Sequence, residues 1–172
     1  IERRLERVEA RYNRGELNGC FPAAQDLVRE ARRTTDELLL GRALNLLGVI
    51  CKEIGRLRRS EACYRRALPL FIRGLGPRHP QTLTSLNNLA LLYDAQGRYG
   101  EAEPLYQRAL AIRQTTLGAA HPDVAGALSN LANIYREQGM YGQAEPLYRR
   151  ALDIKEAALG KNNLGVAISL HN

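Results

Sequence analysis

The chain has 172 residues, a formal net charge of +7 and three cysteines. No apolar run approaches the roughly 20 residues that a membrane span needs, and the cysteines lack the C-x-x-C pairs or neighbouring histidines of a zinc site. The sequence therefore supports neither a membrane span, a disulfide framework nor a zinc site, and we expect no cofactor and no metal.

The charge and the start of the chain say less about function. A net charge of +7 fits an acidic partner, or equally an array cut from a longer chain whose other parts balance it. There is no signal-peptide pattern at Ile1, so we expect a reducing, cytoplasmic setting. The missing initiator methionine indicates a fragment of a longer protein.

Residues 1–36 are predicted to form a degenerate helical hairpin. Leu5, Val8 and Tyr12 follow one helical stripe, and residues 22–32 carry a second stripe after a break at Gly15. The first helix is strongly polar, and its turn is about three residues longer than the turns of the later units. A terminal repeat has one unpartnered face, so these features are typical of a capping hairpin.

A 42-residue unit then organises the rest of the chain. Residues 79–120 and 121–162 are identical at 22 of 42 positions when aligned without a gap, which indicates a repeat protein. A looser copy precedes them, and the start of a truncated further repeat follows them. The predicted single array thus comprises 1–36, 37–78, 79–120, 121–162 and 163–172.

Each unit has the pattern of two helices. Pro80 suits the first turn of a helix that ends at Gly97, and a second helix is expected from Tyr99 or Gly100 to a left-handed stop at Gly118. The buried face of the second helix is predicted to contain Ala102, Leu105, Tyr106, Ala109, Leu110, Ile112 and Leu117.

Small residues at fixed places predict close helix packing. Gly48, Ala90 and Ala132 occupy the same place in successive first helices, where they let a neighbouring helix approach. Cys51 replaces a tyrosine of the apolar stripe, so it is interpreted as a small core residue. His79 and His121 recur before prolines, which indicates helix-start residues and not catalytic ones.

These residues carry a resemblance to a known family. The series Leu-x-x-Leu-Ala-x-x-Tyr and Gly-x-Tyr-x-x-Ala-x-x-x-Tyr-x-x-Ala-Leu, within residues 86–110, resembles the tetratricopeptide repeat. The 42-residue version, with Leu-Asn-Asn-Leu-Ala, Glu-Ala-Glu-Pro-Leu-Tyr and His-Pro, is similar to the repeats of kinesin light chains and of many bacterial proteins. The resemblance implies an all-α fold, an α-solenoid of antiparallel helical hairpins in a right-handed superhelix.

The resemblance also implies a concave peptide-binding groove lined by the first helices. The positions carried over to this sequence are Arg42, Asn45, Val49, Lys52, Thr84, Asn87, Asn88, Leu91, Asp94, Ser129, Asn130, Asn133 and Arg136, with His171 and Asn172 in the remnant. Asparagine amides both donate and accept, so they can pair with the backbone of an extended peptide. Alternatively, Asn88 and Asn130 bond to neighbouring helices and fix the stacking.

Arginines are concentrated on the second helices, as in Arg65-Arg66, Arg108 and Arg149-Arg150. The simpler interpretation is a set of solvated faces whose aliphatic stems cover apolar surface. A convex basic stripe that binds nucleic acid or anionic lipid is the less favoured alternative, because aromatic residues are not interleaved with the arginines.

The sequence shows no Ser-His-Asp set, phosphate loop or paired carboxylates at a useful spacing, so no enzyme is predicted. Two functions stay open. The first is a protein-protein interaction module that binds a peptide segment of a partner in the groove. The second is a structural spacer or self-associating scaffold attached to an omitted effector or enzyme domain. Its motivation is the apolar face of Val166, Ala167 and Leu170.

Overall fold

The computed structural model describes residues 1–159, and within them every regular element is a helix. The helices are α1 (Glu2–Asn13), α2 (Cys20–Ala31), α3 (Glu37–Glu53), α4 (Leu57–Leu75), α5 (Pro80–Ala95), α6 (Tyr99–Leu117), α7 (Pro122–Glu137) and α8 (Tyr141–Leu159). The predicted all-α class is confirmed. The remnant at 163–172, with its apolar face and its two groove candidates, lies outside the described residues.

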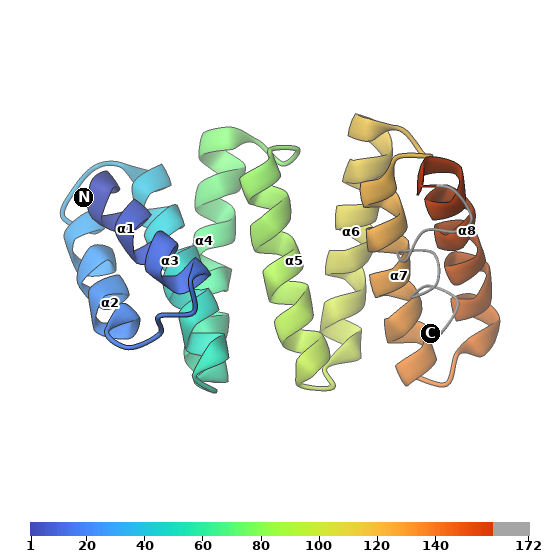
Figure 1. The fold of residues 1–172 in the computed structure, drawn as a ribbon, viewed down its shortest axis with the longest axis horizontal. Helices are drawn as coiled ribbons and strands as arrows, with labels where there is room; N and C mark the ends of the chain where they lie inside the picture. The colour runs from blue at the N-terminus through green and yellow to red at the C-terminus, as the bar shows by residue number, and fades with distance from the viewer. Residues whose placement is uncertain (160–172) are drawn as a thin grey trace. The chain divides into compact units, whose positions relative to one another are not determined.

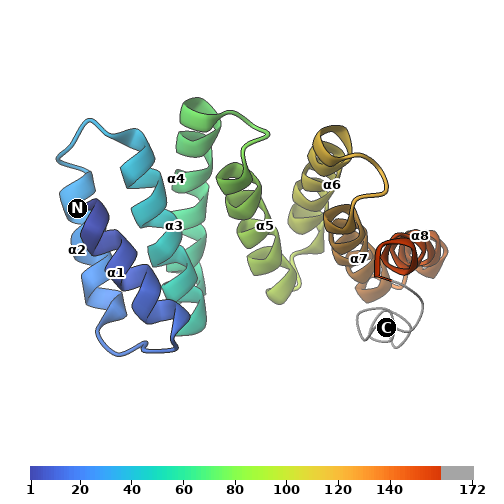
Figure 2. The same ribbon diagram turned by 45° about the horizontal axis from the view of Figure 1, so that its top comes forward.

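The chain divides into two compact units, residues 1–92 and 93–172. In the first unit α3 packs against α1, α2 and α4, and the two views in Figure 1 and Figure 2 show these helices side by side. Leu27, Ile50 and Phe71 are at most 2% exposed in its core. Burial of these side chains is the main force that holds the unit together.

The N-terminal hairpin has the polar character that the sequence predicts. Only Leu5 and Val8 of α1 are buried. The turn between α1 and α2 spans residues 14–19, whereas the turn between α3 and α4 spans residues 54–56, so the first turn is three residues longer.

Tyr64 in α4 lies directly against the backbone of α3 at Gly48. A Cβ atom at Gly48 would lie 2.6 Å from Cε1 of Tyr64, and the Tyr64 side chain is only 1% exposed. The Ser60 hydroxyl donates to the Gly48 carbonyl oxygen at 2.8 Å and also hydrogen-bonds with the Tyr64 side chain. The small residue at this place is therefore a requirement of the packing.

In the second unit α7 packs against both α6 and α8. Tyr106 and Ala109 of α6 are buried as predicted, and Val124 and Leu128 of α7 are fully buried. Leu105, Leu110 and Ile112 are only half-buried, and Leu117 is 44% exposed although its position in the stripe predicted burial. It is the last residue of α6, where the chain leaves the helix through Gly118.

Glycines end α4 and α6, but not in the predicted left-handed helical conformation. Gly118 has φ 91° and ψ 153°, and Gly76 has φ 88° and ψ 163°. A positive φ combined with an extended ψ is open almost only to glycine, because a Cβ atom would clash with the backbone. The chain thus leaves these helices extended instead of curling back over them.

The His-Pro pairs start helices, as predicted. Nδ1 of His121 accepts a hydrogen bond from the backbone N–H of Asp123, and Nδ1 of His79 accepts one from Gln81, each at 3.2 Å. Each imidazole satisfies an N–H that has no partner in its own helix.

Gly48→Ala should lower the free energy of unfolding by about 1–3 kcal/mol, because Tyr64 must shift to admit the methyl group. Gly126→Ala in α7 is the matched control, because a Cβ atom there meets nothing within 4 Å. That change should raise the free energy of unfolding by about 0.5–1 kcal/mol. Urea titrations of both variants check this pair, and equal effects would contradict the packing interpretation.

A second prediction concerns alkaline pH. Burial raises the pKa of the Cys63 thiol to about 11 and also raises the pKa values of Cys51 and Tyr64. The unfolded chain releases these protons at lower pH than the folded chain does. Stability should therefore fall as the pH rises from about 9 to 11. Thermal unfolding across this range checks the trend, and Cys63→Ala should make the decline shallower.

Candidate functional site

Every predicted groove residue from Arg42 to Arg136 is at least partly exposed, as expected for positions that the packing stripe does not use. The two units hold different members of this set. The first unit contains the candidates from Arg42 to Leu91, and the second contains those from Asp94 to Arg136.

In the first unit, three predicted residues from two first helices meet at one cavity. Arg42 and Asn45 of α3 and Thr84 of α5 line a space of about 230 Å³. Its complete lining is Glu9, Arg42, Asn45, Phe71, Gln81 and Thr84. The sequence did not point to Glu9, Phe71 or Gln81, because they come from α1, α4 and the first turn of α5.

Charges of both signs lie at this cavity. The Arg42 guanidinium is 3.7 Å from the Glu2 carboxylate and 3.9 Å from the Glu9 carboxylate. Burial raises the pKa of Glu9, and the positive charge of Arg42 partly opposes this effect. The cavity can therefore meet both donors and acceptors on a ligand, without a preference for one sign of charge.

The asparagines contact each other across two first helices. Nδ2 of Asn88 in α5 donates to Oδ1 of Asn45 in α3 at 3.5 Å, which is the outer limit of a hydrogen bond. This contact bears on the alternative that Asn88 fixes the stacking, since it does link neighbouring helices. The link is nevertheless weak, because the bond is long and both amides are only half-buried.

In the second unit, two candidates are already engaged in structural hydrogen bonds. The Ser129 hydroxyl donates to the Ala125 carbonyl oxygen of its own helix at 3.0 Å. Oδ1 of Asn133 accepts a hydrogen bond from the Tyr148 hydroxyl of α8. A ligand that binds Asn133 would therefore compete with a hydrogen bond that joins α7 to α8.

Asp94 and Arg136 also lie close together in the second unit. Burial raises the pKa of Asp94, Glu137 raises it further, and Arg136 opposes both effects. Nη2 of Arg136 donates to the Glu137 carboxylate at 2.9 Å. Among the described residues, the buried Tyr106 hydroxyl has no hydrogen-bond partner.

Within residues 1–159 no group of three or more His, Cys, Asp or Glu side chains could hold a metal ion. None of the described helices is both long and apolar enough to cross a bilayer. All three cysteines are buried and free, with Cys51 fully buried as predicted for a core residue.

Comparisons with known proteins agree with this architecture. The sequence matches the family model of the tetratricopeptide repeat over residues 39–115 and 123–172. No curated protein sequence gives a significant match.

Three solved structures illustrate the likeness of fold. A putative kinesin light chain with nearly identical TPR-like repeats from Podosopora anserina is 20% identical, with a TM-score of 0.85 over 99% of this chain and 82% of that one. BtubC (BKLC) from P. vanneervenii is 23% identical, with a TM-score of 0.78 over 95% and 67%. Aspartyl phosphate phosphatase F from Bacillus subtilis is 16% identical, with a TM-score of 0.78 over 98% and 42%.

The family model covers well over half of the chain. The kinesin-light-chain-like repeats among the structural neighbours confirm the resemblance drawn from the 42-residue unit. Tetratricopeptide repeats are typically protein-interaction modules that bind protein partners. From its repeat, its helical hairpins and this match, the chain belongs to the tetratricopeptide repeat family.

Proposed function

We propose that this chain is a non-enzymatic interaction module that binds an extended peptide segment of a partner protein along its first helices. The observation that carries the proposal is the meeting of Arg42, Asn45 and Thr84 at one cavity of the first unit. These side chains come from two neighbouring first helices, where a peptide crossing both would contact them in turn.

The amides supply the recognition of peptide backbone. A peptide N–H and carbonyl can replace the 3.5 Å bond between Asn45 and Asn88 at little cost, because that bond is long and half-exposed. Each amide offers both a donor and an acceptor, so the contact does not depend on the side chains of the peptide.

The size of the cavity favours a side chain over a small molecule. Its volume of about 230 Å³ is below the roughly 300–1,000 Å³ of typical small-molecule pockets. The buried Phe71 gives it an apolar wall, and Arg42 with Glu9 gives it a polar edge. One peptide side chain with an apolar body and a polar end would suit this lining.

The same lining argues for binding and against catalysis. Its titratable groups are Glu9 and Arg42, which lie near each other, and it contains no cysteine or histidine nucleophile. The one carboxylate of the lining, that of Glu9, lies 3.9 Å from the Arg42 guanidinium, and no hydrogen bond joins it to the Thr84 hydroxyl among the described contacts.

Asn45→Ala combined with Asn88→Ala should weaken binding of a selected peptide about tenfold, because two backbone-directed amides are lost. The peptide is first selected on the natural chain from a displayed random library and then titrated by calorimetry. Gln143→Ala, an exposed amide of α8, is the control and should leave the affinity unchanged.

An unchanged affinity in the double variant would overturn the groove proposal. The scaffold alternative depended on residues 163–172, outside the described residues, so no observation favours it.

A further inference from the structure

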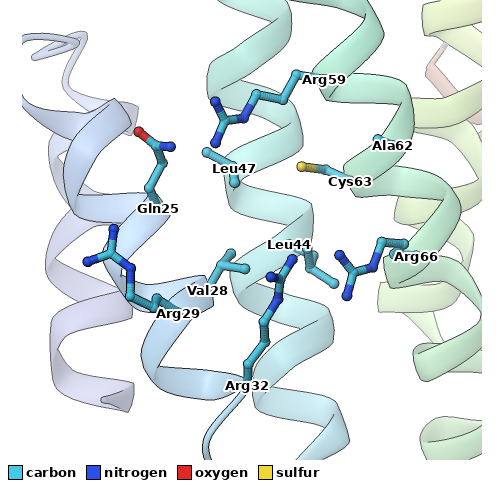
Figure 3. A pocket seen from close by; sticks show the side chains of 10 residues that line it. All are labelled: Gln25, Val28, Arg29, Arg32, Leu44, Leu47, Arg59, Ala62, Cys63 and Arg66. Atoms are coloured by element: carbon cyan, nitrogen blue, oxygen red, sulfur yellow. The ribbon is translucent and has the colours of Figure 1, made fainter.

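A second cavity of the first unit lies between α2 and α4, with α3 as its floor (Figure 3). Its volume is about 300 Å³. Leu44 and Leu47 of α3, which are 2% and 4% exposed, form the apolar floor together with Val28 of α2. We call this cavity the arginine pocket, and its lining is Gln25, Val28, Arg29, Arg32, Leu44, Leu47, Arg59, Ala62, Cys63 and Arg66.

The charges of the arginine pocket are all of one sign, because four lining residues are arginines and none is acidic. In Figure 3 the guanidinium groups of Arg32, Arg59 and Arg66 reach into the space between α2 and α4. Arg29 turns away and pairs with Asp26 at 3.1 Å. For Arg32 and Arg66, the described part of the chain supplies no carboxylate within ion-pair distance.

The arginine pocket is separate from the groove of the proposed function. Successive residues of a helix are about 100° apart around its axis, so Asn45 and Leu47 lie about 160° apart on α3. Asn45 faces the first cavity and Leu47 faces the arginine pocket. A ligand could therefore occupy either cavity without touching the other.

Arg59 has a further contact that fixes one wall of the arginine pocket. Its guanidinium lies 5.1 Å from the centre of the Phe21 ring, within the range of a cation–π contact. This holds one positive charge at the rim while Arg32 and Arg66 keep their donors for a ligand. Three guanidinium groups that line one pocket repel each other, and an anion bound in the pocket attracts all three and offsets this repulsion.

We propose that the arginine pocket is a second docking site, for an acidic segment of a partner protein. A glutamate or aspartate carboxylate of the segment accepts hydrogen bonds from Arg32 and Arg66, in the bidentate geometry that guanidinium groups favour, and a second acidic side chain of the segment pairs with Arg59. A neighbouring apolar side chain of the segment packs on Leu44 and Leu47. The site is thus expected to recognise an acidic side chain next to an aliphatic one.

The lining favours a protein ligand over a nucleic acid. Nucleic-acid sites that hold unpaired bases use aromatic side chains as stacking platforms, and no aromatic residue lines the arginine pocket. The aliphatic floor matches a leucine-like side chain, and a base or sugar would leave it poorly covered. The pocket also lies between two helices, whereas a lipid surface requires a broad, open basic face.

The test uses the full chain and fluorescent synthetic peptides in which glutamates flank a leucine. Arg32→Gln, Arg59→Gln and Arg66→Gln combined should weaken their binding at least tenfold, because charge-assisted hydrogen bonds are lost. The matched control combines Arg33→Gln, Arg58→Gln and Arg65→Gln, which removes the same charge at exposed positions outside the pocket. The control should change the affinity less than twofold.

Two further variants test whether the loss of binding comes from the arginine pocket itself. The single variant Arg66→Glu leaves the Phe21 contact of Arg59 in place, and it should also weaken binding at least tenfold. Asn45→Ala with Asn88→Ala should leave acidic-peptide binding unchanged, which separates this site from the groove.

Three results would overturn the proposal. They are equal binding of peptides with glutamine in place of glutamate, an equal loss in the matched control, and no binding of any acidic peptide by the natural chain. A single-stranded DNA that binds more tightly than the peptides, and is lost in the pocket variant, would assign the site to nucleic acid instead.

Discussion

Each helix of this chain must bury its apolar side against helices close to it in sequence, because a repeat array has no single central core. In the first unit α3 meets this constraint by packing on both α2 and α4. Because Gly48 has no side chain, the Tyr64 ring of α4 can pack directly against the backbone of α3. One side of α3 then presents Arg42 and Asn45 to the first cavity, and another side presents Leu44 and Leu47 as the floor of the arginine pocket.

Much of the fold was predictable because the repeat marks its own helix ends. The His-Pro pairs and the glycines place the helix boundaries nearly residue by residue, since each satisfies a local requirement of the backbone. Two predictions were wrong. Leu117 was expected to be buried but is exposed, and Gly118 was expected to be left-handed helical but is extended. The apolar stripe says nothing about where the chain departs from a helix, and glycine permits several conformations with positive φ.

The candidate sites were only partly predictable, because each cavity is lined by several helices. Arg42, Asn45 and Thr84 could be named in advance, since Arg42 and Thr84 occupy equivalent places in neighbouring repeats and Asn45 lies one helical turn from Arg42. Glu9 could not, because it belongs to the degenerate hairpin, where the repeat pattern fails. The arginines of the second helices were visible in the sequence, but their convergence with Arg32 across α3 depends on tertiary packing.

The recurring tyrosine of the second helices has different hydrogen-bond partners in different repeats. Tyr64 hydrogen-bonds with Ser60 of its own helix, whereas Tyr148, at the equivalent place, donates to Asn133 of the preceding helix. The places of Ser60 and Asn133 are taken by Ala144 and Val49 in the other repeat. Either partner satisfies a half-buried or buried phenol, but the two solutions use different helices. A chimera that joins α3 to α8 would therefore supply neither partner, whereas one that joins α7 to α4 would supply both.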